Sequence, residues 1–144
     1  WRPQQEVAVN NPDSLSLSVM VAASQIAADP LTPETVNRVL GSIPYNQDYF
    51  RREFKKQVGL TPPKYQEFKR MEHAMALLAS GQTVKQAAAF VGYDDSYYFS
   101  RMFKRYIGVS PARYKQLIKL HQEGAYPRGE EDGMAVFPLL QPVT

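Results

Sequence analysis

Residues 49–65, YFRREFKKQVGLTPPKY, recur forty-nine positions later as residues 98–114, YFSRMFKRYIGVSPARY. Eight of the seventeen aligned pairs are identical. They include two phenylalanines four positions apart in each copy, which share one face of a helix. Each copy has the pattern of a helix, a glycine break and a second helix that begins with a proline after a capping hydroxyl. The chain therefore contains one helical unit twice.

A short helix and a tight turn are predicted immediately before the second copy, in residues 83–99, TVKQAAAFVGYDDSYYF. Small alanines in the short helix permit two helices to cross closely, and Gly92 suits a turn that needs a positive φ. Asp94 or Asp95 is placed to cap the helix that follows. This succession is typical of a helix-turn-helix motif, in which the second helix projects its N-terminal half outward.

Apolar residues at helical spacing also predict helices before the first copy. Residues 36–50, VNRVLGSIPYNQDYF, keep an apolar stripe of helical period, with Gly41 where the helix should continue and Pro44 in the turn. Residues 14–29 favour an opening helix that ends before Pro30. The first copy therefore has a less regular version of the same helix-turn-helix pattern.

A long helix is predicted between the two turn motifs. Thr61 is a candidate N-cap, Pro62 suits the first helical position, and Gly81 ends the helix. Its apolar residues recur every three or four positions and form one stripe: Tyr65, Phe68, Met71, Met75 and Leu78. We expect Tyr65 and its counterpart Tyr114 to lie in the core. Because strand-like alternation is almost absent, we expect an all-α fold.

The positive charge of the chain is concentrated in residues 42–121. This window holds 14 of the 17 lysines and arginines and 6 of the 14 acidic residues, a net charge of +8, whereas the rest of the chain has a net charge of −5. A basic helical unit indicates a polyanionic partner such as nucleic acid. The alternative is a solvated helix surface without such a partner.

Composition and spacing argue against several other classes of protein. The chain has 144 residues, of which 44% are hydrophobic, but no segment approaches the roughly 20 apolar residues that span a membrane. The absence of cysteine excludes disulfide scaffolds and cysteine-based zinc sites. His73 and His121 lack the spacing of metal ligands, and no nucleophile has a partner base. We therefore expect no enzyme, no metal and no cofactor.

Residues 92–114, GYDDSYYFSRMFKRYIGVSPARY, resemble the second-subdomain signature of the AraC/XylS family of transcription regulators. Residues 84–91, VKQAAAFV, lead into that motif, and residues 71–81, MEHAMALLASG, resemble the family's linker helix. The resemblance extends over residues 15–117 and is looser in the first subdomain. It implies two homeodomain-like helix-turn-helix subdomains joined by a long linker helix. It also implies a bacterial, cytoplasmic regulator, more often an activator, that binds double-stranded DNA sequence-specifically.

The resemblance further implies contact with RNA polymerase. Because the chain begins with Trp1 instead of Met, we expect a fragment whose signal-sensing domain lies elsewhere, and a homodimer could form through that missing region. Two helix-turn-helix units on one chain predict contact with two consecutive major-groove segments. The recognised DNA site should therefore be asymmetric.

The predicted division of the chain has five parts. They are an N-terminal linker (1–13), a first helix-turn-helix subdomain (14–65), a linker helix (62–81), a second helix-turn-helix subdomain (82–121) and an acidic, then apolar tail (122–144). Three interpretations of the tail remain open: disorder, packing of Val136, Phe137 and Leu139 on the domain, or the start of another domain.

The outward face of each predicted recognition helix supplies the candidate DNA contacts. Candidates for contact with base edges are Asn46, Gln47, Asp48, Arg51 and Arg52 in the first helix, and Ser96, Tyr97, Ser100 and Arg101 in the second. Arginine can bind guanine in bidentate fashion, asparagine or glutamine can bind adenine, and a tyrosine ring can contact a thymine methyl group. Candidates for contact with phosphate are Lys55, Lys56, Lys104 and Arg105. The alternatives are an intramolecular ion pair for Arg52 and Arg101, and simple solvation for the lysines.

A second function fits the same composition. A basic helical protein-interaction module could bind an acidic partner, such as part of the transcription machinery. Such a module would show no steep salt dependence on DNA and no preference among duplexes, whereas phosphate contacts make DNA binding strongly salt-dependent.

Overall fold

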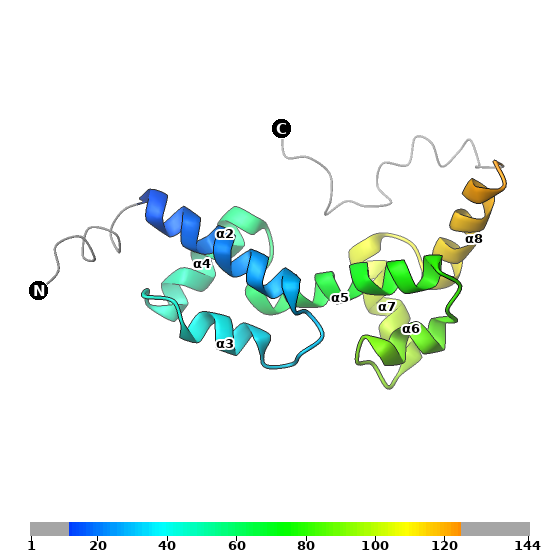
Figure 1. The fold of residues 1–144 in the computed structure, drawn as a ribbon, viewed down its shortest axis with the longest axis horizontal. Helices are drawn as coiled ribbons and strands as arrows, with labels where there is room; N and C mark the ends of the chain where they lie inside the picture. The colour runs from blue at the N-terminus through cyan, green and yellow to red at the C-terminus, as the bar shows by residue number, and fades with distance from the viewer. Residues whose placement is uncertain (1–11, 125–144) are drawn as a thin grey trace, which may run out of the picture. The chain divides into compact units, whose positions relative to one another are not determined.

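The computed structural model describes residues 12–124, and within this range every regular element is an α-helix. The helices are α2 (Pro12–Ala28), α3 (Thr35–Gly41), α4 (Gln47–Val58), α5 (Pro62–Ala79), α6 (Val84–Phe90), α7 (Ser96–Ile107) and α8 (Pro111–Gln122) (Figure 1). The predicted all-α fold is confirmed. Residues 1–11 and 125–144 lie outside the described range, and with them most of the predicted N-terminal linker and of the predicted tail, including Val136, Phe137 and Leu139.

The described residues fall into two compact units, and the boundary between them lies inside the long helix α5, between Lys69 and Arg70. In the first unit, α2 packs against both α3 and α4 (Figure 1). Every third or fourth residue of α2 faces this contact, as expected for one face of a helix. The buried cluster consists of Leu15, Val19, Ala22 and Ile26 from α2, Val36, Val39 and Leu40 from α3, and Phe50 and Phe54 from α4.

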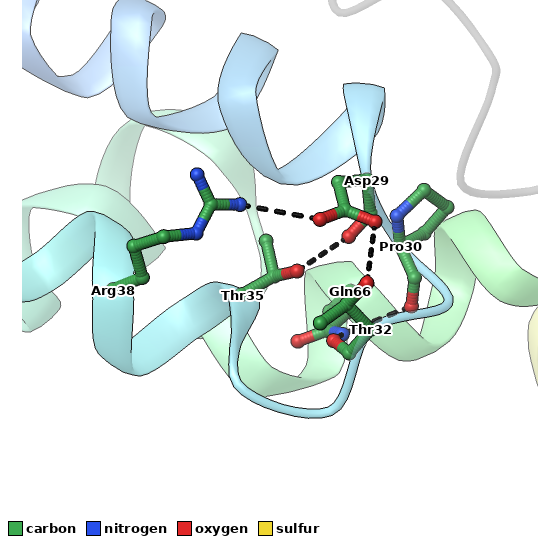
Figure 2. A network of polar contacts seen from close by, with 6 residues as sticks. All are labelled: Asp29, Pro30, Thr32, Thr35, Arg38 and Gln66. Atoms are coloured by element: carbon green, nitrogen blue, oxygen red, sulfur yellow. Dashed lines mark hydrogen bonds and ion pairs between the residues drawn. The ribbon is translucent and has the colours of Figure 1, made fainter.

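The loop between α2 and α3 is fastened to α5 by a buried side-chain amide (Figure 2). Gln66 is only 5% exposed, and its Nε2 donates to the carbonyl oxygens of Pro30, at 2.9 Å, and Thr32, at 2.7 Å. The hydroxyl of Thr35 also donates to the Asp29 carbonyl at 2.6 Å. The Gln66 bonds therefore hold the loop against α5, and the Thr35 bond holds the start of α3 to the residue that follows α2. Each gives a buried or partly buried polar group the partner that it would otherwise lack.

In the second unit, α7 packs against both α6 and α8. Ala87 and Ala88 of α6 are buried, which fits the prediction that small residues let the two helices approach closely. Gly92 follows α6 with a φ of +97°, and the amide of Tyr93 donates to the Ala88 carbonyl at 2.8 Å. This pattern is that of a helix end closed by a left-handed glycine, so the predicted role of Gly92 is confirmed.

A row of aromatic rings runs through each unit and explains why the sequence repeats. Each row begins with a tyrosine in the turn, continues through the two phenylalanines of the recognition helix and ends on a tyrosine of the next helix. In the first unit the successive centroid distances are 6.3, 6.4 and 5.7 Å along Tyr45, Phe50, Phe54 and Tyr65. In the second they are 5.7, 5.8 and 5.9 Å along Tyr93, Phe99, Phe103 and Tyr114. The identical aromatic residues of the repeat are thus mainly core residues. At Tyr114, burial raises the pKa of the hydroxyl.

Candidate nucleic-acid interface

The N-termini of α4 and α7 are each fixed by one side-chain cap. The Asn46 side-chain oxygen accepts a hydrogen bond from the Tyr49 amide at 3.0 Å. In the second unit one carboxylate oxygen of Asp95 accepts from the amides of Tyr97, at 2.9 Å, and Tyr98, at 3.3 Å. Of the two aspartates that the sequence offered as caps, Asp95 is therefore the one used. These caps set where each recognition helix begins and so which side chains its first turn presents.

We expect Asp95→Ala to lower the free energy of unfolding by about 0.5–2 kcal/mol, since two amides at the start of α7 lose their acceptor. Urea-induced unfolding followed by circular dichroism measures this change. Asp94→Ala is the matched control, because Asp94 is exposed and does not cap α7. Equal effects of the two substitutions would contradict the assignment of the cap.

The outward face of α4 is polar and mostly basic. Phe50 and Phe54 are buried, and six polar side chains of the helix are exposed: Gln47, Asp48, Arg51, Arg52, Lys55 and Lys56. The candidates Gln47 and Arg51 lie four positions apart, on one side of the helix. Asn46 is also exposed, but its oxygen is occupied by the cap. Bidentate binding to adenine uses both the oxygen and the nitrogen of a side-chain amide, and the cap engages only the oxygen of Asn46.

The outward face of α7 has a different character. Tyr97 is 83% exposed, Ser96 and Ser100 are half-buried, and Arg101, Lys104 and Arg105 are exposed. The helix thus presents an aromatic ring and two hydroxyls up to Ser100 and positive charge from Arg101 onward. The first half of a recognition helix contacts base edges in helix-turn-helix proteins, so α7 offers mainly uncharged groups there.

Neither Arg52 nor Arg101 makes an ion pair within the described part of the chain. Arg101 instead places its guanidinium 5.9 Å from the centre of the Tyr98 ring. A cation held over an aromatic ring keeps its charge exposed while its position is restricted. Among residues 12–124 the structure therefore gives no support to the alternative that Arg52 and Arg101 form intramolecular ion pairs.

The turn tyrosines Tyr45 and Tyr93 support the recognition helices, and the sequence did not indicate this role. Tyr45 contacts Tyr49 at 6.4 Å and Phe50 at 6.3 Å between ring centroids. Tyr93 contacts Tyr98 at 6.0 Å and Phe99 at 5.7 Å. The repeat aligns at an offset of 49, but these two tyrosines are 48 apart, so alignment of the copies does not pair them. The feature of the sequence that could have indicated this role is an aromatic residue in the turn before each capped helix.

Other kinds of site find little support in the described residues. Among residues 12–124 no group of three or more His, Cys, Asp or Glu side chains is arranged to hold a metal ion. His73 stacks on Phe90, with ring centroids 5.6 Å apart and planes only 6° from parallel. No helix in the described range is both long and apolar enough to cross a membrane.

A family model described as a helix-turn-helix domain matches residues 42–117. Among solved structures, the chain is 33% identical to the C-terminal domain of AraT, a response regulator from Geobacillus stearothermophilus, with a TM-score of 0.57 over 71% of this chain and 86% of that chain. The C-terminal domain of the two-component response regulator yesN from Fusobacterium nucleatum is 26% identical, with a TM-score of 0.50 over 72% of this chain and 98% of that one. A DNA-binding transcriptional dual regulator from Escherichia coli K-12, 18% identical with a TM-score of 0.58 over 71% and 92% of the two chains, shares the fold. No curated protein sequence matches the chain.

Proposed function

The chain belongs to the AraC/XylS family of transcription regulators, and we propose that its helices α4 and α7 enter successive segments of the major groove of one asymmetric DNA site. The observation that carries this proposal is the doubled recognition helix. In each unit a capped helix buries two phenylalanines and exposes the opposite face of its first half. The two exposed faces differ in sequence, so the two half-sites should differ as well.

We propose base contacts for the exposed and half-buried side chains in the first half of each helix, on its outward side. In the first unit these are Asn46 at the start of α4 and Gln47, Asp48, Arg51 and Arg52 within it, and in α7 they are Ser96, Tyr97, Ser100 and Arg101. The arginine guanidinium matches the two acceptors of guanine, and glutamine matches adenine. Arg51 is the strongest candidate in α4, because it is exposed in the first half of the helix and its guanidinium can donate two parallel hydrogen bonds to one guanine.

We propose phosphate contacts for the basic residues nearer the C-terminal ends of the two helices: Lys55 and Lys56 in α4, and Lys104 and Arg105 in α7. All four side chains are exposed. Contacts with phosphate position a protein on the duplex but do not distinguish base sequences.

Lys55→Ala should weaken binding to all duplexes by a similar factor. One phosphate contact fewer should reduce the slope of log affinity against log salt concentration by about 0.9. Fluorescence anisotropy titrations at several salt concentrations measure both quantities. Lys119→Ala, on α8, removes the same charge outside the recognition helices and serves as the control. A change in base preference without a change in slope would contradict the phosphate assignment.

The family membership also supports a regulator that acts in the bacterial cytoplasm and activates transcription through contact with RNA polymerase. Transcription in vitro from a promoter that carries the bound site tests this part of the proposal. We expect more transcript when the protein is added. Less transcript would indicate a repressor.

The proposed arrangement on DNA is tested by hydroxyl-radical footprinting on a bound duplex. We expect two protected patches whose centres lie about one helical turn, roughly 10 base pairs, apart. A single patch would show that only one of the two units contacts DNA closely.

A further inference from the structure

The two recognition helices present opposite chemistry at the same position of their first turn. In the aligned repeat, Asp48 of α4 corresponds to Tyr97 of α7, and Arg51 corresponds to Ser100. The first helix therefore offers charged groups where the second offers a ring and a hydroxyl. Helices that differ in this way are suited to different base edges.

Tyr97 is the most exposed of the large hydrophobic side chains in the described part of the chain, at 83%. Its ring makes no contact with another described ring, although its backbone amide donates to Asp95. The neighbouring Tyr98 is different, since it contacts Tyr93 at 6.0 Å and lies under the Arg101 guanidinium at 5.9 Å. Tyr98 thus belongs to the support of α7, whereas the Tyr97 ring is free to contact a ligand.

The surroundings of Tyr97 favour a neutral, apolar contact. Exposed Asp94 and Asp95 precede it, and the half-buried hydroxyls of Ser96 and Ser100 flank it. Two adjacent carboxylates disfavour the approach of a phosphate group to this end of the helix. In the major groove, the C5-methyl group of thymine is the apolar feature that distinguishes one base from the other three.

We infer that α7 recognises a thymine in its half-site through contact between the Tyr97 ring and the thymine C5-methyl group. This inference rests on the proposed function. The aligned Asp48 of α4 has no aromatic ring to contact a methyl group, and its carboxylate can accept a hydrogen bond from the N4 amino group of cytosine. The half-site bound by α7 therefore depends on a thymine methyl group, and the corresponding position in the half-site bound by α4 does not.

Deoxyuridine tests the contact because it differs from thymidine only by the missing methyl group. Each thymine of a bound duplex is replaced in turn by deoxyuridine, and the affinity is measured by fluorescence anisotropy. At one position in the half-site of α7 we expect affinity to fall about fourfold, the factor that corresponds to one methyl group removed from a buried contact. The same scan over the half-site of α4 should show no such position at the place aligned with Tyr97.

Two variants assign the effect to the ring. Tyr97→Ala should bind the thymine and deoxyuridine duplexes equally, while Tyr97→Phe, which lacks only the hydroxyl, should keep the fourfold difference. A second comparison tests the methyl group in another base. A duplex with 5-methylcytosine at that position should bind the unsubstituted protein more tightly than a duplex with cytosine there. Since Tyr97 is exposed, circular dichroism should show that both variants retain their helices.

The inference is overturned if deoxyuridine is neutral throughout while two unlike half-sites are still recognised, and the proposed function then stands. It is also overturned if Tyr97→Phe loses as much affinity as Tyr97→Ala, because that result indicates a hydrogen bond from the hydroxyl. If no duplex is preferred over another, the proposed function and the inference fall together.

Discussion

Phe103→Ala is expected to lower the free energy of unfolding by about 3–5 kcal/mol, the usual range for removal of a fully buried phenylalanine ring. Phe103 is 0% exposed, and its ring lies 5.8 Å from that of Phe99 and 5.9 Å from that of Tyr114. Alanine leaves a cavity at the centre of this aromatic row, between α7 and α8. Urea-induced unfolding followed by far-ultraviolet circular dichroism measures the loss.

Phe90→Ala is the matched control for this experiment, because it removes the same ring from a site that is 59% exposed. A surface substitution changes stability by about 0.5 kcal/mol or less. The stacking of Phe90 on His73 adds a modest contribution to this figure. If Phe103→Ala were no more destabilising than Phe90→Ala, the aromatic row would not be the core that holds the recognition helix.

Arg51→Ala is expected to weaken binding to the preferred DNA site by about 1–3 kcal/mol and to relax discrimination at one base pair. The loss should be large because the guanidinium can donate two parallel hydrogen bonds to one guanine. Competition experiments with duplexes that carry each of the four base pairs at every position of the half-site identify the affected position.

Two further variants separate base recognition from charge. Arg51→Lys keeps the positive charge but not the planar pair of donors, so it should retain non-specific binding and lose most of the discrimination. Arg38→Ala removes an exposed arginine of α3 that is paired with Asp29 at 3.3 Å, outside the recognition helix. This control should leave base preference unchanged. An equal loss on all duplexes for Arg51→Ala would instead place Arg51 on phosphate.

The features that could be predicted from the sequence are those set by near neighbours in the chain. Phenylalanines four positions apart share a helix face, and this spacing identified the buried side of α4 and α7. The caps at Thr61, Asp95 and Ser110 involve amides only two or three residues away. The positive φ of Gly92 could be predicted from the tight turn in which it lies. Such short-range determinants can be recognised in the sequence before any tertiary contact is known.

The features that could not be predicted depend on residues distant in sequence or on a shifted register. Gln66 has no obvious role in the polar pattern of α5, but it binds carbonyls 34 and 36 residues earlier. Tyr45 and Tyr93 make equivalent contacts, although they are 48 residues apart and the two copies align at an offset of 49.

In the proposed function, one chain recognises two different DNA segments with two different helices. The most direct test is selection of bound duplexes from a library randomised over about 30 base pairs, at two salt concentrations. We expect two unlike boxes with centres about one helical turn apart and no palindrome. A palindromic site, or tight binding that is lost at moderate salt without any enriched sequence, would contradict it.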